Sequence, residues 1–160
     1  MNVTFEGKTE TGKDEWLTPP ELIKKIGTFD LDPCSPIVRP WDTAKNHFNI
    51  NDNGLLKNWN GRVWCNPPYG RQAVKWLEKC AQHNNCIALT FARTETKMFF
   101  EQVWNKATAV FFIKGRLKFY HVNGQQGDSA GAPSILIAYG NECAKMLQSL
   151  QIQGKFIKLK

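Results

Sequence analysis

The stretch Asn66-Pro67-Pro68-Tyr69 carries the residue types best suited to chemistry in this 160-residue chain. Its two prolines fix φ at about −65° and remove two backbone N–H donors, so the apolar strand before them must end there. The amide oxygen of Asn66 and the carbonyl of Pro67 remain as acceptors, and Tyr69 adds an aromatic face. A planar amino group against that ring could donate both hydrogens to the two oxygens. Such a site would hold the exocyclic amine of a nucleobase or a side-chain amide; the alternative is a plain Pro-Pro turn with a surface tyrosine.

The hydrophobic pattern predicts the elements that must position this turn. Strands are expected over 28–33, 62–66, 86–91, 109–113 (running on toward 119) and 134–139, with shorter ones near 45–48 and 155–158. Helices are expected over 20–26, 71–83, 94–104 and 142–150, with Thr18 and Thr94 as the caps of the first and third. Strands that alternate with helices, several of them fully apolar, predict a doubly wound α/β fold, whose twisted sheet is mostly parallel and flanked by helices.

Polar clusters follow three of the predicted strands. They are Asp32-Pro33-Cys34, the Asn-Pro-Pro-Tyr stretch and Ala92-Arg93-Thr94. Ligands of such sheets bind beyond the carboxyl ends of the strands, so we expect the three clusters to share one mouth. The alternative is chance, because every strand end needs a polar turn. The irregular segment 34–60 is long enough to suggest a functional loop, and 124–131 is expected to be a flexible loop.

The charge of the chain indicates a polyanionic partner. The formal net charge is +7 and the isoelectric point is about 9.2, which favours nucleic acid. Lys114, Arg116 and Lys118 alternate along one predicted strand, so they would share a face of it. Two interpretations stay open for these three residues: contacts to phosphates, or a solvated edge strand.

Cysteine usage and hydropathy limit the location of the protein. The chain has five cysteines, an odd number without a C-x-x-C spacing, and three histidines without metal-ligand spacing. This argues against zinc or another metal and favours a reducing, cytoplasmic compartment. No apolar stretch is long enough to span a bilayer. Residues 1–14 are polar and read as a flexible arm, without a signal peptide.

Together, the motifs of this chain resemble those of the small phage-type DNA N-6-adenine methyltransferases, the Dam family of phages and prophages. The pieces that carry the resemblance cover about residues 14–140, in the family's order: Glu15-Trp16-Leu17-Thr18-Pro19-Pro20-Glu21-Leu22, Leu31-Asp32-Pro33-Cys34-Ser35, Asp52-Asn53-Gly54-Leu55 with Trp59, Val63-Trp64-Cys65-Asn66-Pro67-Pro68-Tyr69-Gly70, Phe91-Ala92-Arg93-Thr94-Glu95-Thr96-Lys97 and Gly115-Arg116-Leu117-Lys118-Phe119. The Asn-Pro-Pro-Tyr motif alone is less specific, because methyltransferases acting on RNA guanine or on a release-factor glutamine also carry it.

The resemblance implies a Rossmann-like methyltransferase fold, S-adenosylmethionine as methyl donor and an adenine flipped out of double-stranded DNA as acceptor. Its catalytic residues would be Asn66, Pro67, Pro68 and Tyr69. Asn66 and the Pro67 carbonyl would accept the two amino hydrogens, and Tyr69 would stack on the base. No metal or strong base is needed, because the leaving group is neutral and positioning supplies most of the rate.

The resemblance also implies a set of binding residues. For the cofactor these are Trp16, Thr18, Pro19, Asp32, Pro33, Cys34, Asp52 and Asn66. Thr18-Pro19 would hold the methionine moiety, Asp32 its ammonium or a ribose hydroxyl, and Asp52 the adenine amine; the structural alternatives are a helix cap, a turn Asp and an Asx turn. For the DNA the residues are Tyr69, Arg93, Lys114, Arg116 and Lys118, with a structural ion pair as the alternative for Arg93. One departure stands out: the first strand leads into Asp-Pro-Cys-Ser-Pro and not into a glycine-rich turn.

We therefore expect a single catalytic domain over 15–160, with target recognition in the loops 35–60 and 116–133. It would act in the cytoplasm of a bacterial host, encoded by a phage or prophage. Two other functions stay open at this point. One is methyl transfer to RNA or to a protein glutamine through the same motif, and the other is a non-catalytic nucleic-acid-binding domain.

Overall fold

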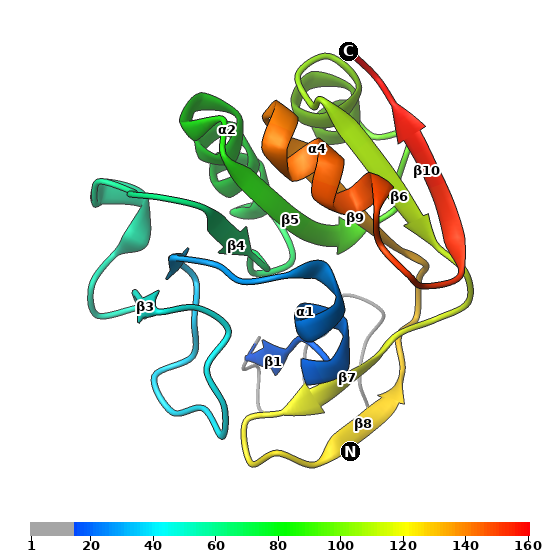
Figure 1. Cartoon of the computed structure of the whole chain (residues 1–160). Coiled ribbons are helices and arrows are strands. Elements are labelled where there is room, and N and C mark those ends of the chain that lie inside the picture. Colours follow the sequence, from blue (N-terminus) through cyan, green and yellow to red (C-terminus); the bar gives the residue numbers. More distant parts are fainter. Residues whose placement is uncertain (1–14) are drawn as a thin grey trace.

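The computed structural model describes residues 15–160, so the predicted arm over 1–14 lies outside the described residues. Its main feature is a seven-stranded sheet with the strand order β10-β6-β9-β5-β4-β2-β3 (Figure 1). The strands are β2 (Leu31–Asp32), β3 (Asn46–His47), β4 (Val63–Cys65), β5 (Cys86–Phe91), β6 (Ala109–Ile113), β9 (Ser134–Tyr139) and β10 (Gly154–Lys158). The strands predicted over 86–91, 109–113 and 134–139 are confirmed, whereas the one predicted over 28–33 is only two residues long.

The sheet is mixed, which corrects the expectation of a mostly parallel one. Strands β3, β2, β4 and β5 pair in parallel, whereas β9 pairs antiparallel with both β5 and β6, and β10 antiparallel with β6. Three of the six pairings described within this sheet are thus antiparallel. The reason lies in the connection between β6 and β9, which contains strands and no crossover helix, so the chain returns in the opposite direction.

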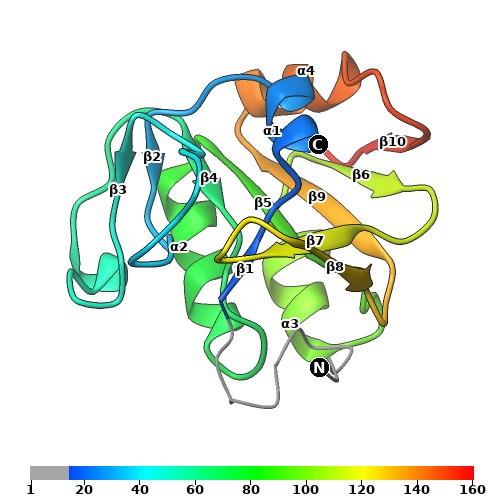
Figure 2. The same ribbon diagram turned by 90° about the horizontal axis from the view of Figure 1, so that it is seen from below.

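Helices cover both faces of this sheet (Figure 2). One face packs against α1 (Pro20–Ile26) and α4 (Asn141–Gln148), and the other against α2 (Ala73–His83), α3 (Lys97–Phe99) and η2 (Phe100–Trp104), a π-helix. Successive residues of β5 alternate between the two cores: Ile87 and Leu89 face the first, and Ala88 the second. All residues of β5 and β9 are buried, as their continuous apolar runs predict.

A separate antiparallel sheet joins β1 (Trp16–Leu17), β7 (Lys118–His121) and β8 (Gln126–Ser129). The strand predicted to run from 109 toward 119 instead ends at Ile113, and Gly115, with φ +78°, turns the chain away. Of the three alternating cations only Lys118 lies in a strand, so the prediction that they share a strand face is wrong. The predicted flexible loop over 124–131 contains β8.

Two predicted helix caps are also wrong. The residue that caps α1 is Pro19, and the Thr18 side chain is turned inward, where it is 2% exposed. Helix α3 is capped by Thr96, whose hydroxyl accepts from the backbone N–H of Phe99, and not by Thr94. Thr18 is thereby available for a contact elsewhere. None of the helices in the described part of the chain has the length and apolar character that crossing a membrane requires.

Candidate active site

The Asn-Pro-Pro-Tyr loop leaves the carboxyl end of β4, a central strand. All three residues of β4 are fully buried between β2 and β5, so Asn66, the next residue, starts from a fixed backbone. Its side-chain amide is oriented by the segment between β1 and α1, because Asn66 Nδ2 donates to the Thr18 hydroxyl over 3.3 Å. Thr18 therefore contributes to the site by holding the Asn66 amide, a contact between residues 48 positions apart.

The Asn66 side chain has one unused polar atom. Its Oδ1 is buried and accepts no hydrogen bond from any described residue. Buried acceptors are paired in the great majority of cases, because an unpaired one costs about 1–3 kcal/mol. With Nδ2 held by Thr18, the free oxygen is fixed in place as an acceptor for a ligand that donates hydrogen bonds.

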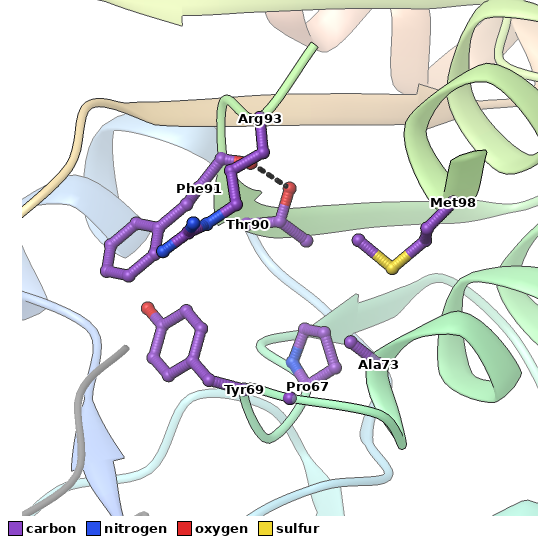
Figure 3. A pocket seen from close by; sticks show the side chains of 8 residues that line it. Pro67, Tyr69, Ala73, Thr90, Phe91, Arg93 and Met98 are labelled. Atoms are coloured by element: carbon purple, nitrogen blue, oxygen red, sulfur yellow. Dashed lines mark hydrogen bonds between the residues drawn. The ribbon is translucent and has the colours of Figure 1, made fainter. Parts of the chain in front are cut away.

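Two cavities lie on either side of this loop. The larger one has a volume of about 570 Å³, within the range of small-molecule and cofactor sites. It is lined by Glu15, Trp16, Pro33, Cys34, Ser35, Pro36, Ile37, Asn49, Ile50, Asn53, Gly54, Leu55, Asn66, Pro68, Gln72 and Trp76. The smaller one, of about 150 Å³, is lined by Pro67, Tyr69, Gly70, Ala73, Thr90, Phe91, Arg93 and Met98 (Figure 3).

One wall of the large cavity is held closed by tight contacts. Gly54 comes so close to the turn after β2 that a Cβ atom there would lie 2.3 Å from the Pro33 carbonyl oxygen. Trp59 Nε1 donates to the Gly54 carbonyl over 2.9 Å, and Lys79 Nζ donates to the Leu55 carbonyl over 2.8 Å. Burial lowers the pKa of Lys79. These contacts fix the short helix η1 (Gly54–Leu56) against α2 and give the cavity a preformed shape.

Asp32 lies beside the large cavity and lines a small space of about 20 Å³ together with Thr18 and Asn66. Its carboxylate accepts from the Thr43 hydroxyl and, over 3.1 Å, from the backbone N–H of Cys34. Burial raises its pKa to about 6, although both hydrogen bonds and the charge of Arg39 oppose that rise. Asp32 thus holds the turn that forms the cavity wall, and its ionisation falls near neutral pH.

Asp52 does not form the Asx turn that is its structural alternative, because its side chain bonds backward to Asn49, whereas an Asx turn bonds to the backbone N–H two residues ahead. Its Oδ2 accepts from the backbone N–H of Asn49 over 2.8 Å. Asp52 itself does not line the large cavity, whereas its neighbours Asn53 and Gly54 do. The motif therefore shapes the cavity wall, and a direct contact from Asp52 to a ligand stays a prediction.

Aromatic stacking organises the small cavity. The rings of Tyr69 and Phe91 are stacked, with centroids 4.5 Å apart and planes at 17°. The Arg93 guanidinium lies 5.8 Å from the centroid of the Phe91 ring. Figure 3 shows the two rings on the side of the cavity opposite Met98. The Tyr69 hydroxyl is buried without a hydrogen-bond partner among the described residues, and burial raises its pKa.

The structure brings together most, but not all, of the predicted site residues. Trp16, Pro33, Cys34, Asn66 and Pro68 line the large cavity, and Pro67, Tyr69 and Arg93 the small one. The single expected mouth is therefore two cavities that share one loop. The predicted residues that line neither are Thr18, Pro19, Asp32, Asp52, Ala92, Thr94, Lys114, Arg116 and Lys118, of which Thr18 and Asp32 line the small space beside the large cavity.

Sequence reasoning missed the contribution of α2 to the large cavity. Trp76 and Gln72 line it, and Lys79 holds its wall, yet all three read as ordinary helix residues. Trp76 stacks on Trp59 at 6.3 Å, so the tryptophan noted beside Gly54-Leu55 was the available signal. Trp59 indicated this wall of the large cavity, but not the residues of α2 that complete it.

The five cysteines are all free thiols. Burial raises the pKa of each, and Cys65, Cys80 and Cys86 lie next to one another in the core. Protonated, buried thiols of this kind act as small apolar side chains. In the part of the chain that the structure describes, no group of three or more His, Cys, Asp or Glu side chains is placed to hold a metal ion.

Comparison with known families gives one match. The model of the family "DNA N-6-adenine-methyltransferase (Dam)" matches residues 7–151, which is most of the chain. Comparisons with curated proteins and with solved structures found no match.

Proposed function

The chain belongs to the DNA N-6-adenine-methyltransferase (Dam) family and is an enzyme that methylates adenine in DNA. From this we propose that it transfers a methyl group from S-adenosylmethionine to the 6-amino group of an adenine flipped out of double-stranded DNA, at specific sites. The observation that carries the proposal is the buried, unpaired Oδ1 of Asn66 at the carboxyl end of β4.

The proposed role of Asn66 follows from the hydrogen bonds of an adenine amino group. That group has two hydrogens, and in an intact duplex one of them is committed to base pairing, so the base must leave the helix. Asn66 Oδ1 would accept one hydrogen and the Pro67 carbonyl the other. Two acceptors in fixed positions turn the nitrogen lone pair toward the methyl group and hold it in line, which lowers the entropic part of the barrier.

The large cavity is the proposed cofactor site. Its volume of about 570 Å³ is in the range of sites that hold small molecules and cofactors. Asn66, the residue proposed to hold the amino group, is part of its lining. When bound, S-adenosylmethionine supplies the methyl group from a sulfonium centre. Trp16, Pro33, Cys34 and Asn66 are the predicted cofactor residues that line the cavity, with Trp76 added from α2.

The remaining predicted cofactor residues act on this site less directly. Thr18 holds the Asn66 amide, Asp32 fixes the Cys34 turn, and Asp52 fixes the segment next to Gly54. A direct contact from Asp32 to the methionine ammonium is supported by its position beside the cavity. Pro19 supports the site as the residue that caps α1, next to Thr18.

The DNA side of the site is proposed to include Tyr69, as the surface on which the flipped base stacks, and Arg93. Lys114, Arg116 and Lys118 are exposed cations that would contact phosphates from the turn after β6 and from β7, not from one strand face. The proposed recognition loops 35–60 and 116–133 are in contact, because the rings of Trp41 and Tyr120 meet edge to face at 5.2 Å. This contact supports one catalytic domain over 15–160. The five free thiols support a reducing, cytoplasmic location in a host cell.

Incubation with tritiated S-adenosylmethionine and unmethylated DNA, followed by nucleoside analysis, tests the proposal. We expect the label in 6-methyladenine, and less of it in DNA whose adenines are already methylated. Parallel incubations with RNA and with a glutamine-containing peptide test the other acceptors of this motif. Label in either of these, and none in DNA, would overturn the proposal.

A further inference from the structure

The hairpin made of β7, the turn 122–125 and β8, here called the outer hairpin, lies outside the seven-stranded sheet (Figure 1). Among the described residues, strand β8 pairs only with β7, so no described strand occupies its other edge. Five of the side chains along the turn and β8 are exposed: Asn123, Gln125, Gln126, Asp128 and Ser129. The hairpin therefore offers polar groups that the core does not use.

The outer hairpin is fixed relative to the large cavity. The His121 ring lies 4.6 Å from the ring of Trp16, which lines that cavity. Gly127 allows close packing, because a Cβ atom there would lie 3.0 Å from the Trp16 ring. At the other end, Tyr120 contacts Trp41 of the loop 35–60. A ligand held by this hairpin would thus be placed at a fixed distance from the proposed methyl-transfer site.

The surface of the hairpin fits nucleic acid better than protein. None of the exposed large hydrophobic side chains among the described residues lies between 116 and 129, whereas protein interfaces are centred on such side chains. The exposed groups are amides, a hydroxyl and a carboxylate, flanked by Arg116 and Lys118. Polar, positively charged surfaces are typical of nucleic-acid interfaces.

Two amides of the hairpin are available for a partner. Asn123 is used by the turn, where its Oδ1 accepts from the backbone N–H of Gln125 over 2.9 Å. The side chains of Gln125 and Gln126 make contacts of 3.4 Å to Asn123 and 3.5 Å to the Tyr120 hydroxyl. Contacts this long at exposed positions are weak and are readily exchanged for better ones.

Resting on the proposed function, we infer that the outer hairpin enters the major groove beside the target adenine, where Gln125 and Gln126 determine sequence specificity. The major groove of B-DNA admits a two-stranded ribbon, and glutamine pairs with the N6 and N7 edge of adenine through two hydrogen bonds. The deep, narrow groove of an RNA duplex does not admit such a ribbon. Arg116 and Lys118 contact the phosphates on either side.

The test is methylation of a duplex library that has random bases around one adenine, followed by sequencing of the methylated products. Wild type is compared with Gln125→Ala, Gln126→Ala and the double variant. We expect each single variant to lose about 5- to 150-fold of discrimination at one A·T pair. Gln148→Ala is the matched control, because Gln148 is an exposed amide on α4, away from the hairpin, and should leave the preference unchanged.

A substitution that changes which base is preferred gives a result that a general loss of DNA binding cannot produce. Gln126→Glu should shift the preference at its position toward cytosine, because a carboxylate accepts from the cytosine amino group. Cofactor affinity, measured by calorimetry, should match wild type in all variants. An unchanged sequence preference in the double variant, or stronger methylation of RNA duplexes, would overturn this inference alone. No methylation of DNA by wild type would overturn the proposed function and this inference with it.

Discussion

The two cavities beside the Asn-Pro-Pro-Tyr loop are built in different ways. The large cavity is formed by segments that are distant in the sequence, and loop contacts around Gly54 and Lys79 hold one of its walls in place. The small cavity is formed by the ends of two buried strands and by the helices that follow them. Alternate residues of the loop serve the two sides: Asn66 and Pro68 the large cavity, and Pro67 and Tyr69 the small one.

This difference teaches how one short motif can serve two ligands. An extended chain points successive residues in opposite directions, so four residues between two cavities give two to each. If the cofactor takes the large cavity and the base lies against Tyr69, substitutions on the two sides should separate. Those on the large side should change cofactor affinity, and those on the small side should change only the reaction with DNA.

Asn66→Ala should have the largest effect, because Asn66 faces the cofactor side but serves the amino group. Its loss removes one of two acceptors, which by analogy with an oxyanion-hole donor costs about 2.7–4 kcal/mol, or about 100- to 1,000-fold in turnover. Cofactor affinity should stay within a few-fold. Single-turnover methylation and calorimetry measure the two quantities. Asn60→Ala, at an exposed position before β4, is the control; near-normal turnover of Asn66→Ala would contradict the acceptor role.

The next effect concerns pH and Asp32. Because its pKa of about 6 exceeds the ordinary value of 3.8, the folded state binds this proton more tightly than the unfolded state. Its contribution to stability is therefore complete below about pH 4 and is lost as the pH rises through 6, by about 3 kcal/mol in all. Urea unfolding between pH 4 and 7 should show the stability of wild type falling with rising pH relative to that of Asp32→Asn, because the contributions of groups common to both proteins, such as His47, cancel in the comparison.

The cofactor sharpens this pH experiment. A methionine ammonium near Asp32 would favour the carboxylate and lower its pKa, so the wild-type slope should shrink when S-adenosylmethionine is added. DNA alone should leave the slope unchanged. A slope that does not respond to the cofactor would place the ammonium away from Asp32.

Two substitutions of Tyr69 test the small cavity. Tyr69→Ala removes the proposed stacking surface, worth about 1–3 kcal/mol, and should lower kcat/KM for DNA by about 5- to 150-fold. Tyr69→Phe should keep the activity, because the hydroxyl has no partner among the described residues and its loss leaves the ring in place. Cofactor affinity should not change in either variant. A weaker cofactor affinity in Tyr69→Ala would break the separation between the two cavities.

Lys79→Met should have the smallest effect, and this effect should be limited to the large cavity. It removes the donor to the Leu55 carbonyl but keeps the apolar stem, so we expect a loss of about 1 kcal/mol in unfolding free energy and several-fold weaker cofactor binding. Lys75→Met, an exposed lysine on the same helix, is the control. Equal cofactor affinities in the two variants would show that the hydrogen bond from Lys79 to η1 does not shape the cofactor site.

Much of the core and of the loop chemistry could be predicted from the sequence. The continuous apolar runs over 86–91 and 134–139 require strands that are covered on both faces, and this local pattern is independent of the rest of the chain. Pro67 and Pro68 end β4 by covalent geometry alone, so the position of Asn66 at a strand end was also determined locally. The motif order and the family followed from the same residues.

Other features depended on contacts that no local pattern encodes. Thr18 had every local property of a helix cap, yet its hydroxyl holds Asn66, a residue that only folding brings near. Whether β9 would run parallel or antiparallel, and whether 118–129 would form a separate sheet, depended on where the chain packs after Gly115.

The sequence by itself thus determined which residues are buried and where the strands end, because these follow from side-chain hydrophobicity and backbone sterics. Only the tertiary structure decided that one loop lies between two cavities, that Lys79 closes the wall of one of them, and that the outer hairpin contacts Trp16. Those arrangements join residues tens of positions apart, and their free energy comes from packing the whole domain.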